Sequence, residues 1–169
     1  TSYRILWFCV MVLFFGLPTH AQFQGQEFVE NKGQWPSDVQ FLAKEGPVKI
    51  WMGTDRFLYQ LTDYAPLEKA HHEHLQIDNP TLASNFIEQR FIGINLGVSS
   101  SGYEPYAHTY NFFLGKDQNK WASKVSAFKE VNYQNYYPGV NLKWQNENGH
   151  YKYAFEVSPG ASVNQIQWK

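Results

Sequence analysis

A histidine-rich stretch is the first candidate for chemistry in this chain. The sequence "AHHEH" places His71 and His74 three residues apart, with His72 and Glu73 between them. On a helical turn this spacing would bring two imidazoles to one face, where they could ligate a metal. A zinc-protease helix needs the order H-E-x-x-H, which this stretch lacks. Because the surrounding region is polar, we expect solvated loop histidines and no metal site.

Paired carboxylates and an activated serine are the next chemistries to consider. Glycoside hydrolysis needs two acids facing each other across a cleft. The spacing of the acids near expected strand ends singles out no such pair, and a serine nucleophile would sit in G-x-S-x-G, which does not occur. The "SSSG" over 99–102 is typical of a loop. We therefore expect no catalytic residue, no cofactor and no enzyme activity; the acids considered are Glu30, Asp55, Glu88, Glu104, Glu130 and Glu156.

Aromatic side chains offer a different kind of site, because they form 18% of the residues. Exposed rings can make a stacking platform for a sugar or a peptide, whereas alternating strand aromatics face a core. The wider set of candidates for such a platform is Trp35, Trp51, Trp121, Tyr103, Tyr106, Tyr136 and Tyr137, and we expect most of these to be packing residues. The candidates for an exposed ligand-binding surface are Tyr103, Tyr106, Trp121 and Tyr136.

The first 21 residues have the composition of a secretory signal peptide. Arg4 is their only charge, residues 5–17 are nearly all apolar, and the segment ends in Ala21. This order of charged start, apolar run and small exit residue predicts cleavage after Ala21. The alternative is an uncleaved anchor, but the apolar run is shorter than the about 20 residues of a membrane span. We expect a secreted protein, located outside the cell or on its outer surface, with no membrane span after cleavage.

Cysteine usage and charge narrow the class of protein further. Cys9 is the only cysteine and lies in the leader, so the exported chain has none and must be stable through its core. The 14 basic and 15 acidic residues are nearly balanced, without the basic block that nucleic acid would require. The length of 169 residues fits one domain over 22–169 after the leader.

Alternation of apolar and polar residues predicts an all-β domain, and we expect an antiparallel, jelly-roll-like β-sandwich. Two hairpins are indicated, one over 48–62 with a turn at 53–55, and one over 140–157 around Asn148-Gly149. In the first, Leu58 breaks the pattern of apolar residues on one face. Further strands are expected over 86–97 and from 163 onward, and 64–84 is an excursion or a short helix with loops.

Two turn regions have a specific expectation. In "NYYPGV", Pro138 and Gly139 suit a type II turn that feeds the second hairpin. In "FVENKGQWPSDVQF", over 28–41, charged residues lie close together as they would in a site. We interpret this stretch as a compact, hydrogen-bonded structural loop (a structural knot, without threading of the chain), in which Asn31 or Gln34 is hydrogen-bonded to the main chain.

Four stretches occur in order that together are similar to a known family: "FVENKGQWPSDVQFLAK", "NFFLGKDQNKW", "VNYQNYYPGVNLKW" and "YKYAFEVSPGASVNQI". The chain resembles a DUF7948-like N-terminal domain of unknown function, found in large cell-surface and secreted proteins of Bacteroidetes. The family pattern often has carboxylates where Ala154 and Asn141 stand here, which weakens any role for these positions as acids. The family supplies no known catalytic residues.

The resemblance implies partners rather than a reaction. Such domains precede β-propeller-like SBBP repeats, which would be downstream repeats of the same chain, and a C-terminal domain absent here would address the type 9 secretion machinery. We therefore expect a non-enzymatic module for adhesion, gliding motility or surface display, which could contact a surface glycan or protein. The alternative is a carbohydrate-binding module of a polysaccharide-active exported protein.

Overall fold

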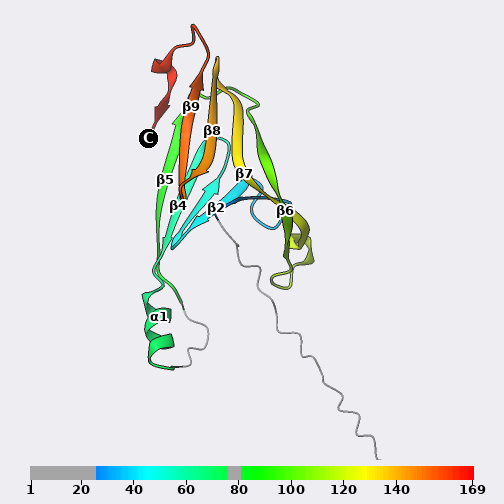
Figure 1. Cartoon of the computed structure of the whole chain (residues 1–169), viewed down its shortest axis with the longest axis vertical. Coiled ribbons are helices and arrows are strands. Elements are labelled where there is room, and N and C mark those ends of the chain that lie inside the picture. The colour runs from blue at the N-terminus through cyan, green and yellow to red at the C-terminus, as the bar shows by residue number, and fades with distance from the viewer. Residues whose placement is uncertain (1–25, 76–80) are drawn as a thin grey trace, which may run out of the picture.

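The computed structural model describes residues 26–75 and 81–169, which form an antiparallel β-structure with little helix (Figure 1). The expected signal peptide, its expected cleavage site and Cys9 lie outside the described residues. In chain order the elements are β1 Phe28–Glu30, β2 Phe41–Glu45, β3 Val48–Met52, β4 Arg56–Thr62, α1 Ala65–His72, β5 Ser84–Ile92, β6 Ser99–Phe112, the 3₁₀ turn Gln118–Lys120, β7 Ala122–Tyr137, β8 Val140–Glu147, β9 His150–Val157, the 3₁₀ turn Val163–Gln165 and β10 Gln167–Trp168.

One long strand, β7, organises the sheet. The strands follow the order β10-β5-β4-β3-β2-β1-β7-β8-β9, and β6 pairs with β7 outside this path. Phe128 of β7 is opposite both Phe28 of β1 and Pro105 of β6, and Val131 is opposite both Trp144 of β8 and Gly102 of β6. Since a strand has two edges, β6 follows one edge of β7 while β1 and β8 share the other. The sheet therefore divides at β7 into two arms. One arm runs through β1, β2, β3, β4, β5 and β10, and the other consists of β8 and β9.

The two arms curl toward each other and enclose the main core. Phe57 of β4 contacts Trp144 of β8 with ring centroids 5.1 Å apart, and Phe91 of β5 contacts Phe155 of β9 at 5.6 Å. In Figure 1, β8 and β9 accordingly lie over β4 and β5. The all-β antiparallel class is confirmed. The finer expectation of a sandwich is not, because continuous pairing from one arm to the other gives a curled sheet instead of two separate ones.

Most local expectations agree with the structure. The hairpins β3–β4 and β8–β9 form as expected, with Asn148 and Gly149 both at positive φ, and Gly139 has the positive φ (69°) that the type II turn needs. The excursion over 64–84 contains α1 and then leads to β5, which ends at Ile92, earlier than expected. The last stretch begins with a 3₁₀ turn before the two residues of β10.

The expected loop at 99–102 is wrong. These residues begin the 14-residue strand β6 and pair with residues 131–134 of β7. The ring of Phe128 lies against Gly102, so close that a Cβ added there would be 2.3 Å from a ring carbon. Because cross-strand pairing outweighs local propensity, the small polar residues adopt strand conformation here.

Candidate functional site

The outer face of the curled sheet carries an apolar row that is distinct from the main core. Cross-strand partners place Ala127, Val29, Leu42, Trp51 and Leu58 side by side across β7, β1, β2, β3 and β4. The first three are buried, whereas Trp51 and Leu58 are only partly buried. The apolar row therefore extends beyond whatever covers it, and ends in a partly open aromatic surface on β3 and β4.

The cover over Val29 and Ala127 combines the β6 side chains Tyr110 and Phe112 with the loop between β1 and β2. Trp35 of this loop contacts Phe112 at 5.4 Å and Trp51 at 5.9 Å, each edge to face. The loop also reaches the hollow described below through Pro36, Asp38 and Val39. Its position thus decides where the outer apolar row becomes accessible.

Asn31 holds this loop in its shape, which confirms the expected structural knot. Its Oδ1 accepts from the backbone amides of Gly33 (2.9 Å) and Trp35 (3.2 Å). Its Nδ2 donates to three carbonyls of the loop, those of Trp35 (3.3 Å), Pro36 (2.9 Å) and Val39 (2.7 Å). Gln34 Nε2 adds a bond to the Glu30 carbonyl at 2.7 Å.

Glu30 connects the same knot to β7. Its carboxylate accepts from the Ser126 amide at 2.8 Å and lies 3.2 Å from Lys32 Nζ. Burial alone would raise the pKa of Glu30, but the hydrogen bonds from Ser126 and the Lys32 ammonium outweigh it and lower the pKa. The charged residues that made this stretch resemble a site thus have structural partners.

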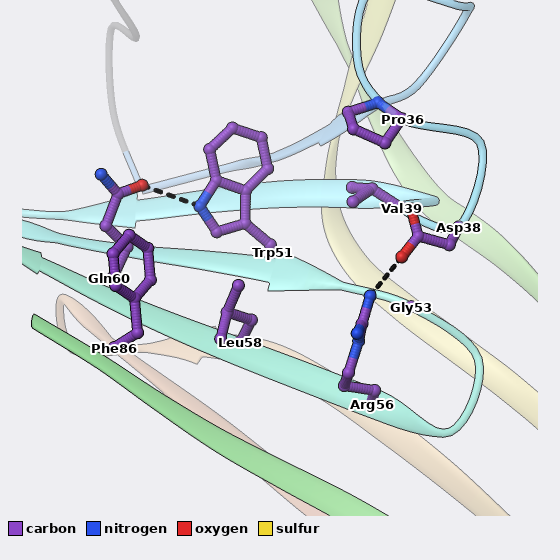
Figure 2. Close-up of a pocket in the computed structure, with 9 residues that line it drawn as sticks. All are labelled: Pro36, Asp38, Val39, Trp51, Gly53, Arg56, Leu58, Gln60 and Phe86. Carbon is purple, nitrogen blue, oxygen red and sulfur yellow. Dashed lines mark hydrogen bonds and ion pairs between the residues drawn. The ribbon is translucent and has the colours of Figure 1, made fainter.

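Beside the loop, β3, β4 and β5 form a hollow of about 290 Å³. Figure 2 shows Leu58 between two polar pairs, with Trp51 and Gln60 at one end and Arg56 and Asp38 at the other. Trp51 Nε1 donates to Gln60 Oε1 at 2.9 Å, and Phe86, 58% exposed, stands next to Gln60. The volume is near the lower end for small-molecule sites, which begin at roughly 300 Å³.

The two charged residues that line this hollow, Arg56 and Asp38, form an ion pair. Arg56 donates to Asp38 and lies 3.6 Å from Glu88, while Lys49 Nζ stands 5.9 Å from the centroid of the Trp51 ring. The cation near the indole face is a cation–π contact. Because the charged residues that line the hollow, Asp38 and Arg56, are one acid and one base that pair with each other, the lining has no excess of either sign. It suits a ligand that is apolar on one side, polar at its edges and uncharged.

The sequence-predicted binding residues do not gather in one place. Tyr103 is 39% exposed on β6, where Gln134 Nε2 donates to its hydroxyl at 3.1 Å. Trp121 is 41% exposed and contacts Phe113, next to the far end of the same strand. Nine residue steps along the strand separate Tyr103 from Phe112, roughly 30 Å at the usual rise. Tyr103 and Trp121 are exposed as expected but cannot share one small ligand.

Tyr106 lies between these two positions and is partly buried. Its ring packs against His108 at 5.3 Å, at the edge of a second buried cluster formed by β1, β6 and β7. It is therefore tied into the fold on one side, with only part of its ring open to a ligand.

Tyr136 is not an exposed residue, so its selection as a surface candidate is corrected. It is 0% exposed, and its hydroxyl donates to the Thr54 carbonyl at 2.8 Å. Burial raises its pKa, with smaller contributions from Tyr137 and Asp55. The register of β7 on β8 shifts between Tyr133 and Tyr137, which turns both Tyr136 and Tyr137 into the core.

A buried acid that the sequence did not single out lies next to the second buried cluster. Glu27 is 1% exposed, its Oε2 is 2.8 Å from His108 Nε2, and its Oε1 accepts from the Tyr110 hydroxyl. A register shift of β6 between Pro105 and Thr109 brings His108 to it. Because the carboxylate is sealed from solvent, this group of side chains ties the start of the domain to β6 and does not offer a reaction site.

The histidine stretch falls at the end of α1. His71 and His72 are exposed, with rings 6.1 Å apart, and His74 follows the helix at positive φ. In the described ranges 26–75 and 81–169, no three His, Cys, Asp or Glu side chains are arranged to hold a metal ion. Within those ranges there is also no helix long and apolar enough to cross a membrane.

The hollow itself was only partly visible in the sequence. Trp51 belonged to the wider set of aromatic residues, and Leu58 was the apolar residue out of phase in its strand. Neither pattern indicated that Phe86 from β5 and the loop over 31–40 would border the same surface. That arrangement depends on β-strand order, which no local motif encodes.

The described part of the chain is thus an all-antiparallel domain with one curled sheet and an accessible aromatic hollow on its outer face. The family described as domain of unknown function (DUF7948) matches residues 28–169, and the chain belongs to this family. No curated protein and no solved structure matches the chain.

Proposed function

We propose that this chain is a non-enzymatic binding module of an exported protein, serving adhesion, gliding motility or surface display outside the cell. The observation that carries the proposal is the outer apolar row, which continues past its cover to Trp51 and Leu58. The core is complete on the inner face without these two side chains. An aromatic surface that the core does not use, bordered by polar groups, fits recognition of a partner.

Export rests on the signal-like composition of residues 1–21. The carbohydrate-binding module of a polysaccharide-active protein is the second candidate, and the neutral hollow around Trp51 favours it. Downstream repeats of the same protein and the type 9 secretion machinery remain proposed partners, implied by the family resemblance.

Two assays test this function. A fusion of the chain to a secreted reporter in a Bacteroidetes host should deliver the reporter outside the cytoplasm, and removal of residues 1–21 should keep it inside. Beads coated with the purified chain should attach to the exporting cells or to their extracellular matrix more than beads coated with albumin. Reporter activity confined to the cytoplasm, or attachment equal to albumin, would contradict the proposal.

A further inference from the structure

The hollow bordered by Trp51, Leu58, Gln60 and Phe86 has a chemistry that selects among possible ligands. Leu58 and the rings of Trp51 and Phe86 provide apolar contact, whereas Gln60, Arg56 and Asp38 provide donors and acceptors at the rim. A pyranose ring has the complementary construction, with an apolar face of C–H groups and an equator of hydroxyls. Its C–H groups are attracted to the negative face of an aromatic ring.

We infer that this hollow is a binding site for a neutral oligosaccharide, with one sugar ring over Leu58 between Trp51 and Phe86. The inference rests on the proposed function, because it names the ligand class of a non-catalytic binding module. Its central contact is apolar stacking, and its rim contacts are hydrogen bonds to hydroxyls.

The rim groups are already oriented by their own contacts. Gln60 accepts from the Trp51 indole through Oε1, while its Nε2 has only long bonds to Thr62 (3.4 Å) and Ser84 (3.3 Å). The amide plane is thus held by one strong bond, and a ligand hydroxyl can replace either of the two long bonds of its N–H groups. A ligand that meets a group of fixed orientation loses less conformational entropy on binding.

Arg56 and Asp38 play the same part at the other end. Their ion pair is half-exposed, with 35% of the Arg56 side chain and 56% of the Asp38 side chain accessible. Paired planar groups can accept and donate to two neighbouring hydroxyls at once. Because the charges compensate each other, an anionic glycan gains no net attraction, which is why the inferred ligand is neutral.

The hollow is open along the outer sheet face, so it suits an internal sugar of a chain as well as an end. Phe86 on one side and Pro36 on the other are both exposed and extend the apolar contact beyond one ring. We therefore expect affinity to rise with the number of sugar units up to about three, and then to level off.

The test measures binding of the purified chain to an array of neutral oligosaccharides that includes cello-, laminari-, xylo- and manno-hexaose, followed by calorimetry on the strongest binder. Trp51→Ala should weaken the Kd by about tenfold or more, as expected for loss of an aromatic contact of ~1.4 kcal/mol. Phe86→Ala should weaken it several-fold. This second variant keeps the test decisive if Trp51→Ala fails to fold, because Phe86 is 58% exposed and its truncation leaves the core unchanged.

Trp121→Ala is the matched control, since Trp121 is also a partly exposed tryptophan and lies outside the hollow. Its Kd should equal that of the unchanged chain. Binding that depends on Trp121 and not on Trp51 or Phe86 would overturn the site while leaving a glycan-binding function. Absence of binding to every neutral glycan, or binding only to acidic glycans or peptides, would overturn the inference; the bead-attachment assay would then decide separately whether the module is adhesive.

Discussion

Replacing Asn31 with alanine should destabilise the domain by about 2–3 kcal/mol, because one side chain organises the whole loop over 31–40. The amide makes two accepted and three donated contacts with backbone groups. A typical hydrogen bond contributes ~1 kcal/mol net. Water can replace some partners, since Gly33 and Pro36 are exposed, so the loss is less than the number of contacts suggests.

Urea unfolding followed by tryptophan fluorescence measures this loss, and a thermal midpoint lowered by about 5–10 °C should accompany it. Asn31→Asp should be at least as harmful, because a carboxylate oxygen would then face three carbonyl oxygens. Asn164→Ala is the control, since Asn164 is exposed and bonds through its backbone amide rather than its side chain. A change below about 0.5 kcal/mol for Asn31→Ala would refute the structural role of the knot.

Three further predictions concern the sheet and its charges. Gly102→Ala should destabilise by about 1–3 kcal/mol in urea unfolding, because the new methyl group would collide with the Phe128 ring; a neutral effect would indicate that this position is a loop. Glu30→Gln should cost about 1 kcal/mol at neutral pH and progressively less as the pH falls below 4.5. Because folding lowers the pKa of Glu30 from its ordinary value of 4.5, its stabilisation is complete above that value and is lost as pH falls through the folded pKa, so an unchanged pH profile of the variant would contradict the Ser126 contact. Tyr133→Phe should be neutral or stabilising by up to ~1 kcal/mol in the same assay, since the buried Tyr133 hydroxyl has no partner among the described residues; a loss above 1 kcal/mol would reveal one.

Local sequence signals predicted the elements that local interactions form. The Asn148-Gly149 turn and the Pro138-Gly139 turn have backbone requirements that few residues meet, so they were readable without a structure. The role of Asn31 was predictable for the same reason, because a short amide side chain between turn residues commonly bonds to nearby main chain.

Long-range arrangement accounts for what the sequence did not reveal. The division of the sheet at β7 requires two strands to share one edge, and alternation in β1 and β8 is the same whether they belong to one sheet or two. Tyr136 was a candidate for the exposed surface, because the register shift that buries it has no sequence signature. Leu58 was the exception in its strand, and its place in the outer apolar row supplies the physical reason for that exception.

The most direct test of the outer-face binding site follows the indole N–H signals of the purified chain by NMR during titration with a neutral oligosaccharide selected from the array. The Trp51 indole N–H donates to Gln60 at the rim of the hollow, so its signal should shift progressively and saturate with the calorimetric Kd. The Trp121 signal should stay in place. Saturable shifts at Trp121 with an unchanged Trp51 signal would contradict the account, as would the absence of any indole shift at saturating ligand.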